Sequence, residues 1–201
     1  MKLIQTFDIF QRAIADYHIL NNIDAPIQIP FPTKSLESLL YEKCWIDAVQ
    51  WHCEDEVRHP KIEAERVRFF KNRIDSLNQT RTNLVEQLDD YFLTSFEHIK
   101  YQSDAKLNTE SPAWAIDRLS ILALKIYHMQ EEVERTDLSL EQFQAYQQKL
   151  ELLLTQKLDL ITAIEQLLGE IEQGKTLFKV YRQVKMYNDA DLNPVLRAIK
   201  S

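Results

Sequence analysis

The chain has 201 residues, a formal net charge of -7 and a pI of about 5.3. This acidic balance argues against general binding of nucleic acids or anionic membranes, because both need a basic face. Only two glycines are present, whereas β-hairpins use glycine in their turns, so the composition favours long helices. With 45% hydrophobic residues, we expect one globular domain over residues 1–201, able to fold without disulfides or a metal.

The two cysteines and the first residues indicate the compartment. Cys44 and Cys53 lie nine residues apart in one predicted helix, or about 13 Å, which is too far for a disulfide. We therefore expect a reduced, cytoplasmic protein. The first twenty residues interleave polar and apolar side chains, unlike a signal peptide. No run approaches the roughly 18 apolar residues that span a membrane.

The first half of the chain predicts two helices joined by a linker. Residues 3–20 place Phe7, Phe10 and Ile14 on one face at helical spacing. The proline-rich stretch 21–33 predicts an extended linker. A second helix begins after Thr33 or Ser35 and runs to about residue 57. It is apolar nearly all round, which is typical of a central helix; its polar exceptions form a single stripe of Lys43, Asp47, Gln50 and Glu54.

The third predicted helix begins near Pro60, extends as far as Ile99, and has an arginine in its apolar stripe. Arg81 stands between Leu77 and Leu84, where the period requires an apolar residue. A charge at such a position must find an anion or reach water, and mid-helix snorkelling is difficult. We therefore predict that Arg81 is buried and paired with a carboxylate on the second or fourth helix.

The second half of the chain predicts two more helices and a tail. Ser111 caps a fourth helix that runs to about residue 135, apolar nearly all round and therefore central. Ser139 opens a fifth helix that holds its period to Gly174. The tail, residues 175–201, either forms a helix with a cationic face or lies extended over the bundle; its cations are Lys175, Lys179, Arg182 and Lys185. The predicted fold is an all-α bundle of about five main helices with this tail packed on it.

Four strings, in order along nearly the whole chain, resemble the DUF4254 family. They are WHCEDEVR at 51–58, KNRIDSLNQTR at 71–81, DRLSILALKIYHM at 117–129 and KMYNDADLNP at 185–194. The resemblance implies a bacterial, all-helical, single-domain protein, and it brings no assigned activity. The strings contain the same polar exceptions that the helical patterns single out.

These polar residues support two interpretations. In the first, a small anionic molecule binds inside the bundle, with or without catalysis. His52 with Asp55 or Glu56 would then do acid–base work, and Arg81, Arg118 and Lys125 would hold the anion. In the second, the protein is a non-catalytic interaction or scaffold protein, the polar residues form a structural network, and the tail contacts the partner. Either interpretation leaves room for a homodimer. The further ligand-binding candidates are Asp75, Asn78, Asp117 and His128.

No metal site is expected from the sequence, and no cofactor is indicated. His52 and Glu56 at i, i+4 offer two ligands, with Asp55 or Asp75 as a third. However, helical dimetal bundles repeat a Glu-x-x-His pair on two helices, whereas this chain has one His-x-x-x-Glu. Cys53 beside His52 is a poor nucleophile–base pair, because adjacent helical residues point about 100° apart.

The spacing along the second and third helices predicts two polar layers. A short connection near Pro60 makes these helices antiparallel neighbours, and Arg81 lies about 30 Å beyond that turn. Arg81 should therefore sit near the level of Leu40, and His52 near Val67. Asp117 and His128, about 16 Å apart along the fourth helix, would then serve one layer each.

Overall fold

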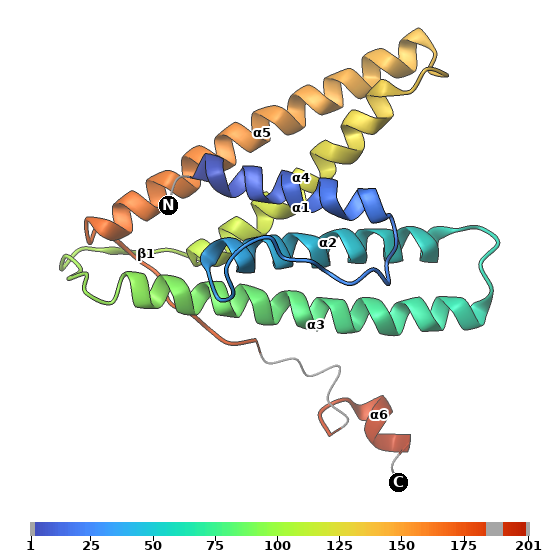
Figure 1. Ribbon diagram of the computed structural model, residues 1–201. Helices are drawn as coiled ribbons and strands as arrows, with labels where there is room; N and C mark the ends of the chain where they lie inside the picture. The colour runs from blue at the N-terminus through green and yellow to red at the C-terminus, as the bar shows by residue number, and fades with distance from the viewer. Residues whose placement is uncertain (1–2, 184–190, 200–201) are drawn as a thin grey trace.

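The computed structural model describes residues 3–183 and 191–199, and five long helices dominate them (Figure 1). The all-α prediction is confirmed, since the strands of the described residues have only two residues each. The helices are α1 Leu3–Leu20, α2 Leu36–Arg58, α3 Ala64–Ser95, α4 Pro112–Glu134 and α5 Leu140–Glu172; short elements are β1 Lys106–Leu107, β2 Thr176–Leu177 and α6 Pro194–Ile199.

Serine side chains begin three of the helices, as the sequence predicts. The Ser35 and Ser111 hydroxyls each accept a hydrogen bond from the backbone N–H three residues on, and Ser139 forms a full capping box with Gln142. The third helix is shorter than predicted, because residues 59–63 run extended and turn before α3 begins at Ala64. It ends at Ser95, where a short turn follows, rather than at Ile99.

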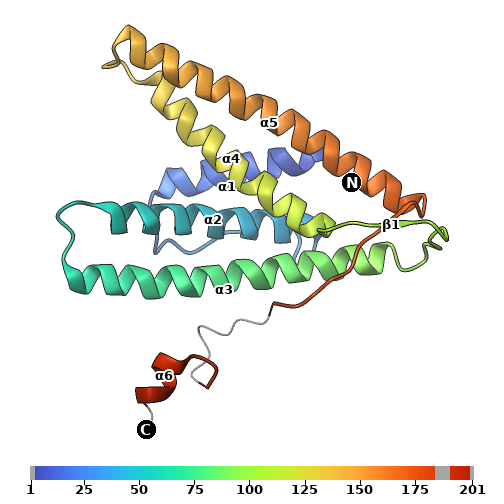
Figure 2. The same cartoon turned by 180° about the vertical axis from the view of Figure 1, so that it is seen from behind.

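The central position of α2 and α4 is confirmed. They contribute ten and eleven buried residues, whereas the longer α5 contributes three. Figures 1 and 2 show α2 and α3 side by side as an antiparallel pair, with α1 and α4 packed on α2. The pair α4–α5 diverges from this body, so its tip projects (Figure 1). No helix of the described residues is long and apolar enough to cross a membrane.

The described start of the tail is extended, which is one of the two predicted alternatives. Thr176 and Leu177 pair in parallel with Lys106 and Leu107. The turn into this strand depends on Gly174, whose φ is +70° and whose added Cβ would lie 2.5 Å from the Lys100 carbonyl oxygen.

Beyond β2 the tail passes over α3. The Arg182 guanidinium donates to the Glu86 carbonyl at 3.0 Å and pairs with the Asp90 carboxylate. Lys175, Lys179 and Arg182 therefore do not form a helical face, and Lys185 lies outside the described residues. The tail is fastened to the bundle by its backbone and by this arginine.

Candidate functional site

Four charged residues from three helices form a buried cluster, here called the charge tetrad: Lys43, Asp47, Arg81 and Asp117. Lys43 and Asp47 are one turn apart on α2, and neither side chain is exposed to solvent. The Lys43 ammonium donates to Asp47 Oδ2 at 2.5 Å and lies 2.9 Å from Asp117 Oδ1. Arg81 Nε donates to Asp117 Oδ1 at 2.9 Å, and a second Arg81 nitrogen donates to Oδ2, a bidentate pair.

The predicted pairing of Arg81 is confirmed. Its carboxylate partner is Asp117 on α4, and Nε also lies 3.5 Å from Asp47 Oδ1 on α2. The predicted full burial is wrong, because 27% of the Arg81 side chain stays exposed. One edge of the guanidinium therefore faces solvent while the other closes the tetrad.

The tetrad pairs two basic side chains with two carboxyl groups; burial raises the pKa of Asp47, although Lys43 opposes that effect. Burial alone would raise the pKa of Asp117, but Lys43 and Arg81 outweigh that effect and lower it. The hydroxyl of the buried Ser120 donates to Asp47 Oδ2 at 2.6 Å. The first half of the polar stripe on α2 is therefore an internal network, and Lys43, Asp47 and Ser120 are site residues that the sequence analysis did not select.

A cleft between α4 and α5 opens at the exposed edge of Arg81. Its volume is about 620 Å³, and its apolar floor includes Ile121, Leu122 and Leu160. This α4–α5 cleft brings together all three cations that the sequence assigns to an anion. Its charged and amide lining residues are Arg81, Asp117, Arg118, Lys125, Gln156 and Asp159.

The other side of Arg81 lines a smaller pocket on α2, of about 310 Å³. Asp47 and Gln50 also line it, and within residues 3–183 and 191–199 each has one buried side-chain oxygen without a hydrogen-bond partner. Trp51 and Asp55 form its far end. Arg81 thus separates a cationic cleft from a pocket lined by unsatisfied acceptors.

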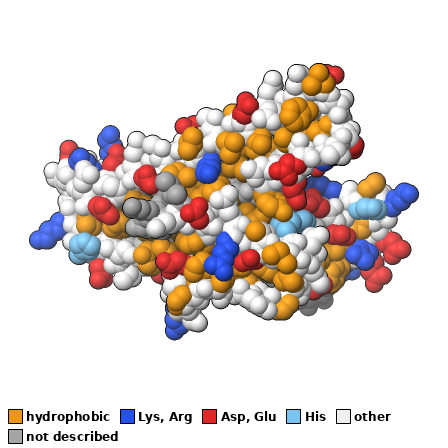
Figure 3. Space-filling view, turned by 45° about the horizontal axis from the view of Figure 1, so that its top comes forward, with side chains coloured by type: hydrophobic (Ala, Val, Ile, Leu, Met, Phe, Trp, Pro, Cys, Tyr) orange, Lys and Arg blue, Asp and Glu red, His pale blue; other side chains and the backbone are white. Residues whose placement is uncertain are grey.

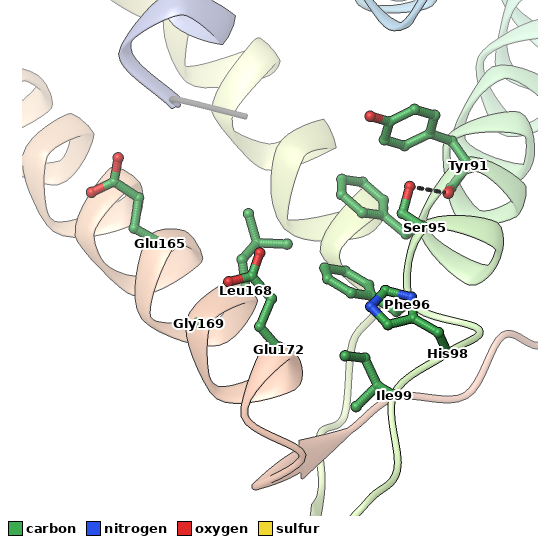
Figure 4. Close-up of a pocket in the computed structure, with 10 residues that line it drawn as sticks. Tyr91, Ser95, Phe96, His98, Ile99, Glu165, Leu168, Gly169 and Glu172 are labelled. Carbon is green, nitrogen blue, oxygen red and sulfur yellow. Dashed lines mark hydrogen bonds between the residues drawn. The ribbon is translucent and has the colours of Figure 1, made fainter.

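A third pocket, of about 540 Å³, lies between the end of α3 and α5. Figure 4 shows Glu165 and Glu172 on α5 across from Phe96, His98 and Ile99. The lining residues include none of the candidates from the sequence. We therefore do not assign the predicted site to this pocket.

Three histidines from three helices form a second polar cluster, here called the histidine triad: His18 of α1, His52 of α2 and His128 of α4. One nitrogen of each lies within 4.8 Å of the others, and His18 Nε2 is 3.2 Å from His52 Nε2. His18 was not a candidate from the sequence. It lies in the last turn of an ordinary amphipathic helix, and only the packing of α1 on α2 and α4 brings it to the others.

Hydrogen bonds on the outer side of the triad orient the rings. His18 Nδ1 lies 2.7 Å from the Ile14 carbonyl oxygen, and His128 Nδ1 lies 2.9 Å from a Glu131 carboxylate oxygen. Since these oxygens only accept, both Nδ1 atoms are donors, and in a neutral ring this leaves the Nε2 atom with a lone pair. Burial lowers the pKa of His18 and of His52, which favours the neutral rings.

Aromatic side chains hold the triad from both sides. Trp51 stacks on His128 with ring centroids 4.9 Å apart, and Tyr17 stacks on His52 at 5.2 Å. Asp55 Oδ2 lies 3.9 Å from His52 Nδ1, so Asp55 is the acidic neighbour of this histidine.

Three other predicted site residues lie away from both clusters. Glu56 pairs with Arg66 on the surface, Asp75 pairs with Lys71 one turn away, and Asn78 accepts a hydrogen bond from Gln50. Glu56 therefore does not assist His52. Asp55 is the predicted acid that lies beside His52.

The two predicted polar layers are present, but their register differs from the prediction. The triad and the tetrad are separate clusters that share α2 and α4. Arg81 reaches Asp47 rather than the level of Leu40, and Asn78 faces Gln50. The reason is that residues 59–63 extend beyond the end of α2, so α3 starts further out than a tight turn allows (Figure 1).

Comparison with known proteins gives one match. The model of a family described as "Protein of unknown function (DUF4254)" matches residues 37–180, well over half of the chain. No curated protein and no solved structure matches the chain. The matched region contains the tetrad, His52 and His128, whereas His18 precedes it.

Proposed function

The chain belongs to the DUF4254 family, and we propose that it binds a small anionic molecule in the α4–α5 cleft. The observation that carries this proposal is the meeting of Arg81, Arg118 and Lys125 around one concave site with an apolar floor. The volume of about 620 Å³ falls within the range of small-molecule sites.

The charges of the cleft favour an anion. The carboxylate of Asp117 is already neutralised, since Lys43 and Arg81 both bind it. Arg118 and Lys125 are exposed, and the one ion-pair partner of Arg118 in the described structure is Glu110, which lies outside the cleft lining. Asp159 is the remaining acid of the lining. A ligand with one acidic group and a short apolar body matches the cations and the floor of Ile121 and Leu160.

The proposed function is binding rather than catalysis at the cleft. Of the acid–base candidates, His52 belongs to the histidine triad and Asp55 lies beside it, and the cleft lining contains no histidine. Along α4, eleven residues separate Asp117 from His128, or about 16 Å. Acid–base work by His52 is therefore not part of the proposal for the cleft.

The second candidate function is a structural role for the tetrad, and the pairing of each of its basic side chains with an acid favours this role. Buried ionic networks can fix one helix register over others. The two roles are compatible, because Arg118 and Lys125 belong to the cleft and not to the tetrad. Variants of these two residues therefore test ligand binding without breaking the network.

Phenyl phosphate, an anion with an apolar ring, is the probe for this proposal. We expect it to bind the wild-type protein in isothermal titration calorimetry. The double variant Arg118→Ala with Lys125→Ala should bind it about 10- to 100-fold more weakly, since two charge-assisted contacts are lost. The matched control, Lys61→Ala with Arg68→Ala, removes the same charges from two exposed positions, one in the connection before α3 and one in α3. Equal affinity in both double variants, or no binding to the wild type, would refute the proposal.

The cellular setting is part of the same proposal. We infer a bacterial cytoplasmic protein, and the family resemblance and two buried free cysteines support this. On the face in Figure 3, Lys and Arg side chains are scattered among acidic ones, which agrees with the absence of general nucleic-acid binding that we propose. A homodimer through α5 is compatible with its exposed Leu152 and Leu158, and light scattering at micromolar concentration decides it.

A further inference from the structure

The histidine triad has a role that the anion proposal does not use. We propose that His18, His52 and His128 together bind one divalent transition-metal ion of the zinc class, in a site with an open coordination position. This inference is independent of the α4–α5 cleft, because the triad and the cleft lining share no residue.

The spacing of the three rings suits such an ion. Zn–N distances of about 2.0–2.1 Å with tetrahedral angles place ligand nitrogens about 3.3 Å apart. His18 Nε2 and His52 Nε2 are already 3.2 Å apart. One nitrogen of each ring lies within 4.8 Å of the other two. Rotation of the side chains that shortens the longest of these separations to about 3.3 Å would complete the site.

The outer hydrogen bonds give His18 and His128 the tautomer that a metal needs. A metal-binding histidine typically donates its second ring N–H to a carbonyl or a carboxylate, which fixes the ring and leaves the other nitrogen free. His18 does this with the Ile14 carbonyl, and His128 does it with Glu131. Asp55 stands beside His52 Nδ1 at 3.9 Å. Two of the three rings therefore have a hydrogen-bonded oxygen acceptor on their outer side, and the third has a carboxylate nearby.

Hydrogen bonding within the triad satisfies the inner ring nitrogens of only two of the three histidines. A proton on His52 Nε2 can bridge to His18 Nε2, since these atoms are 3.2 Å apart. His128 Nε2 is buried and has no hydrogen-bond partner among the residues that the structure describes. Buried polar atoms are normally satisfied, so this nitrogen is unexplained by the protein alone. A single cation at the centre satisfies all three nitrogens at once.

The charge and the ligand type define the class of ion. Three imidazoles without an oxygen ligand suit zinc, cobalt, nickel or copper rather than magnesium or calcium. The carboxylates of Asp55 and Glu131 next to the rings balance the two charges of such an ion. Neither acid belongs to the triad itself.

Three protein ligands leave at least one position for a water molecule. Structural zinc sites close all four positions with protein, whereas catalytic sites keep one open. The side chains of His52 and His128 are 24% and 20% exposed, so solvent reaches the triad. A water bound at such a position has a pKa near 7 and is a nucleophile at neutral pH. The triad is therefore the place where this chain would do hydrolytic or hydration chemistry.

The first test uses the wild-type protein. After treatment with EDTA and dialysis, Zn²⁺ is titrated by calorimetry, and Co²⁺ is added to a second sample for absorption spectroscopy. We expect one equivalent of zinc and the intense visible bands of four-coordinate cobalt, both abolished by excess EDTA. Absence of zinc binding, or cobalt bands of an ion that keeps its full water shell, would overturn the proposal without recourse to any variant.

The second test assigns the ligands. His18→Gln, His52→Gln and His128→Gln should each weaken zinc binding at least about 100-fold, because losing a ligand exceeds the loss from outer contacts. The matched control is His59→Gln with His98→Gln, the two histidines outside the triad. Circular dichroism verifies that each variant is folded. Equal losses in the control, or no loss in the three variants, would place the zinc elsewhere and contradict the proposal.

A third comparison separates this inference from the anion proposal. The double variant Arg118→Ala with Lys125→Ala should bind zinc like the wild type, and His52→Gln should bind phenyl phosphate like the wild type. Zinc binding that is lost with the cleft variant would show that the metal does not sit on the triad.

Discussion

Replacing Arg81 with methionine tests whether the tetrad stabilises the fold. The change removes the bidentate partner of Asp117 and the neighbour of Asp47 Oδ1 while keeping the length and apolar stem of the side chain. Removing one partner of a fully buried ion pair costs about 3–5 kcal/mol, because the other charge stays buried and unpaired.

Two features of the structure reduce that figure. Asp117 keeps Lys43 at 2.9 Å, and 27% of the Arg81 side chain already faces solvent. Exposed pairs contribute about 0–1 kcal/mol. We therefore expect Arg81→Met to lower the free energy of unfolding by about 2–3 kcal/mol, between these two limits.

Urea unfolding followed by circular dichroism measures this change. The midpoint should fall while the m-value stays constant, since the fold is the same. Arg118→Met is the matched control, because 65% of that side chain is exposed and its pair with Glu110 lies at the surface. A loss in Arg81→Met no larger than that in Arg118→Met would show that the tetrad does not hold the helices together.

Three other predictions follow from the same structure. Lys43→Met should lower the free energy of unfolding, measured in urea, by about 3–5 kcal/mol, because the fully buried Lys43 side chain pairs with both Asp47 and Asp117. A decrease below about 1 kcal/mol would contradict a stabilising role for this buried network. Gly174→Ala should lower the free energy of unfolding by about 1–2 kcal/mol, since the φ of Gly174 is +70° and the new Cβ meets the Lys100 carbonyl. Gly169→Ala, at a helical position with open space around it, should raise the free energy of unfolding by about 0.5–1 kcal/mol. Changes of the same sign in both variants would refute this explanation. The pKa of Asp117 is lowered in the folded protein. The stabilisation that Asp117 contributes is therefore complete above its unfolded pKa of about 3.9 and is lost as the pH falls through the folded value. In an acid titration followed by circular dichroism, Asp117→Asn should lack this contribution to the pH dependence of stability.

Helix positions and caps could be predicted because they depend on local sequence. Ser35, Ser111 and Ser139 each begin a helix, and each signal lies within four residues of the structure it determines. The central position of α2 and α4 also follows from their all-round apolar pattern. The register of α3 against α2 did not follow, because it depends on the path of residues 59–63, which no periodic pattern describes.

The candidate site could be predicted only in part. Arg81 stands out because it interrupts an apolar stripe, and that interruption correctly predicts a carboxylate partner. Lys43 and Asp47 look like an ordinary i, i+4 surface pair, so their burial is visible only when α3 and α4 cover them. A polar stripe on an otherwise apolar helix was the available signal.

His18 shows a different limit. Its position on α1 is unremarkable in sequence, and the linker of residues 21–33 separates it from the second helix. The expectation of no metal site rests on a single His-x-x-x-Glu pair, with Asp55 or Asp75 as a third ligand, and on the lack of a Glu-x-x-His pair repeated on two helices. It does not apply to three helices that each contribute a single histidine.

Native mass spectrometry of the freshly purified protein tests the proposed anion site most directly. We predict that the wild-type chain retains a small-molecule mass that is released as an anion, and that His52→Gln retains the same mass. The double variant Arg118→Ala with Lys125→Ala should lose it. An anionic ligand that stays bound in the double variant would contradict the assignment of the α4–α5 cleft as the binding site.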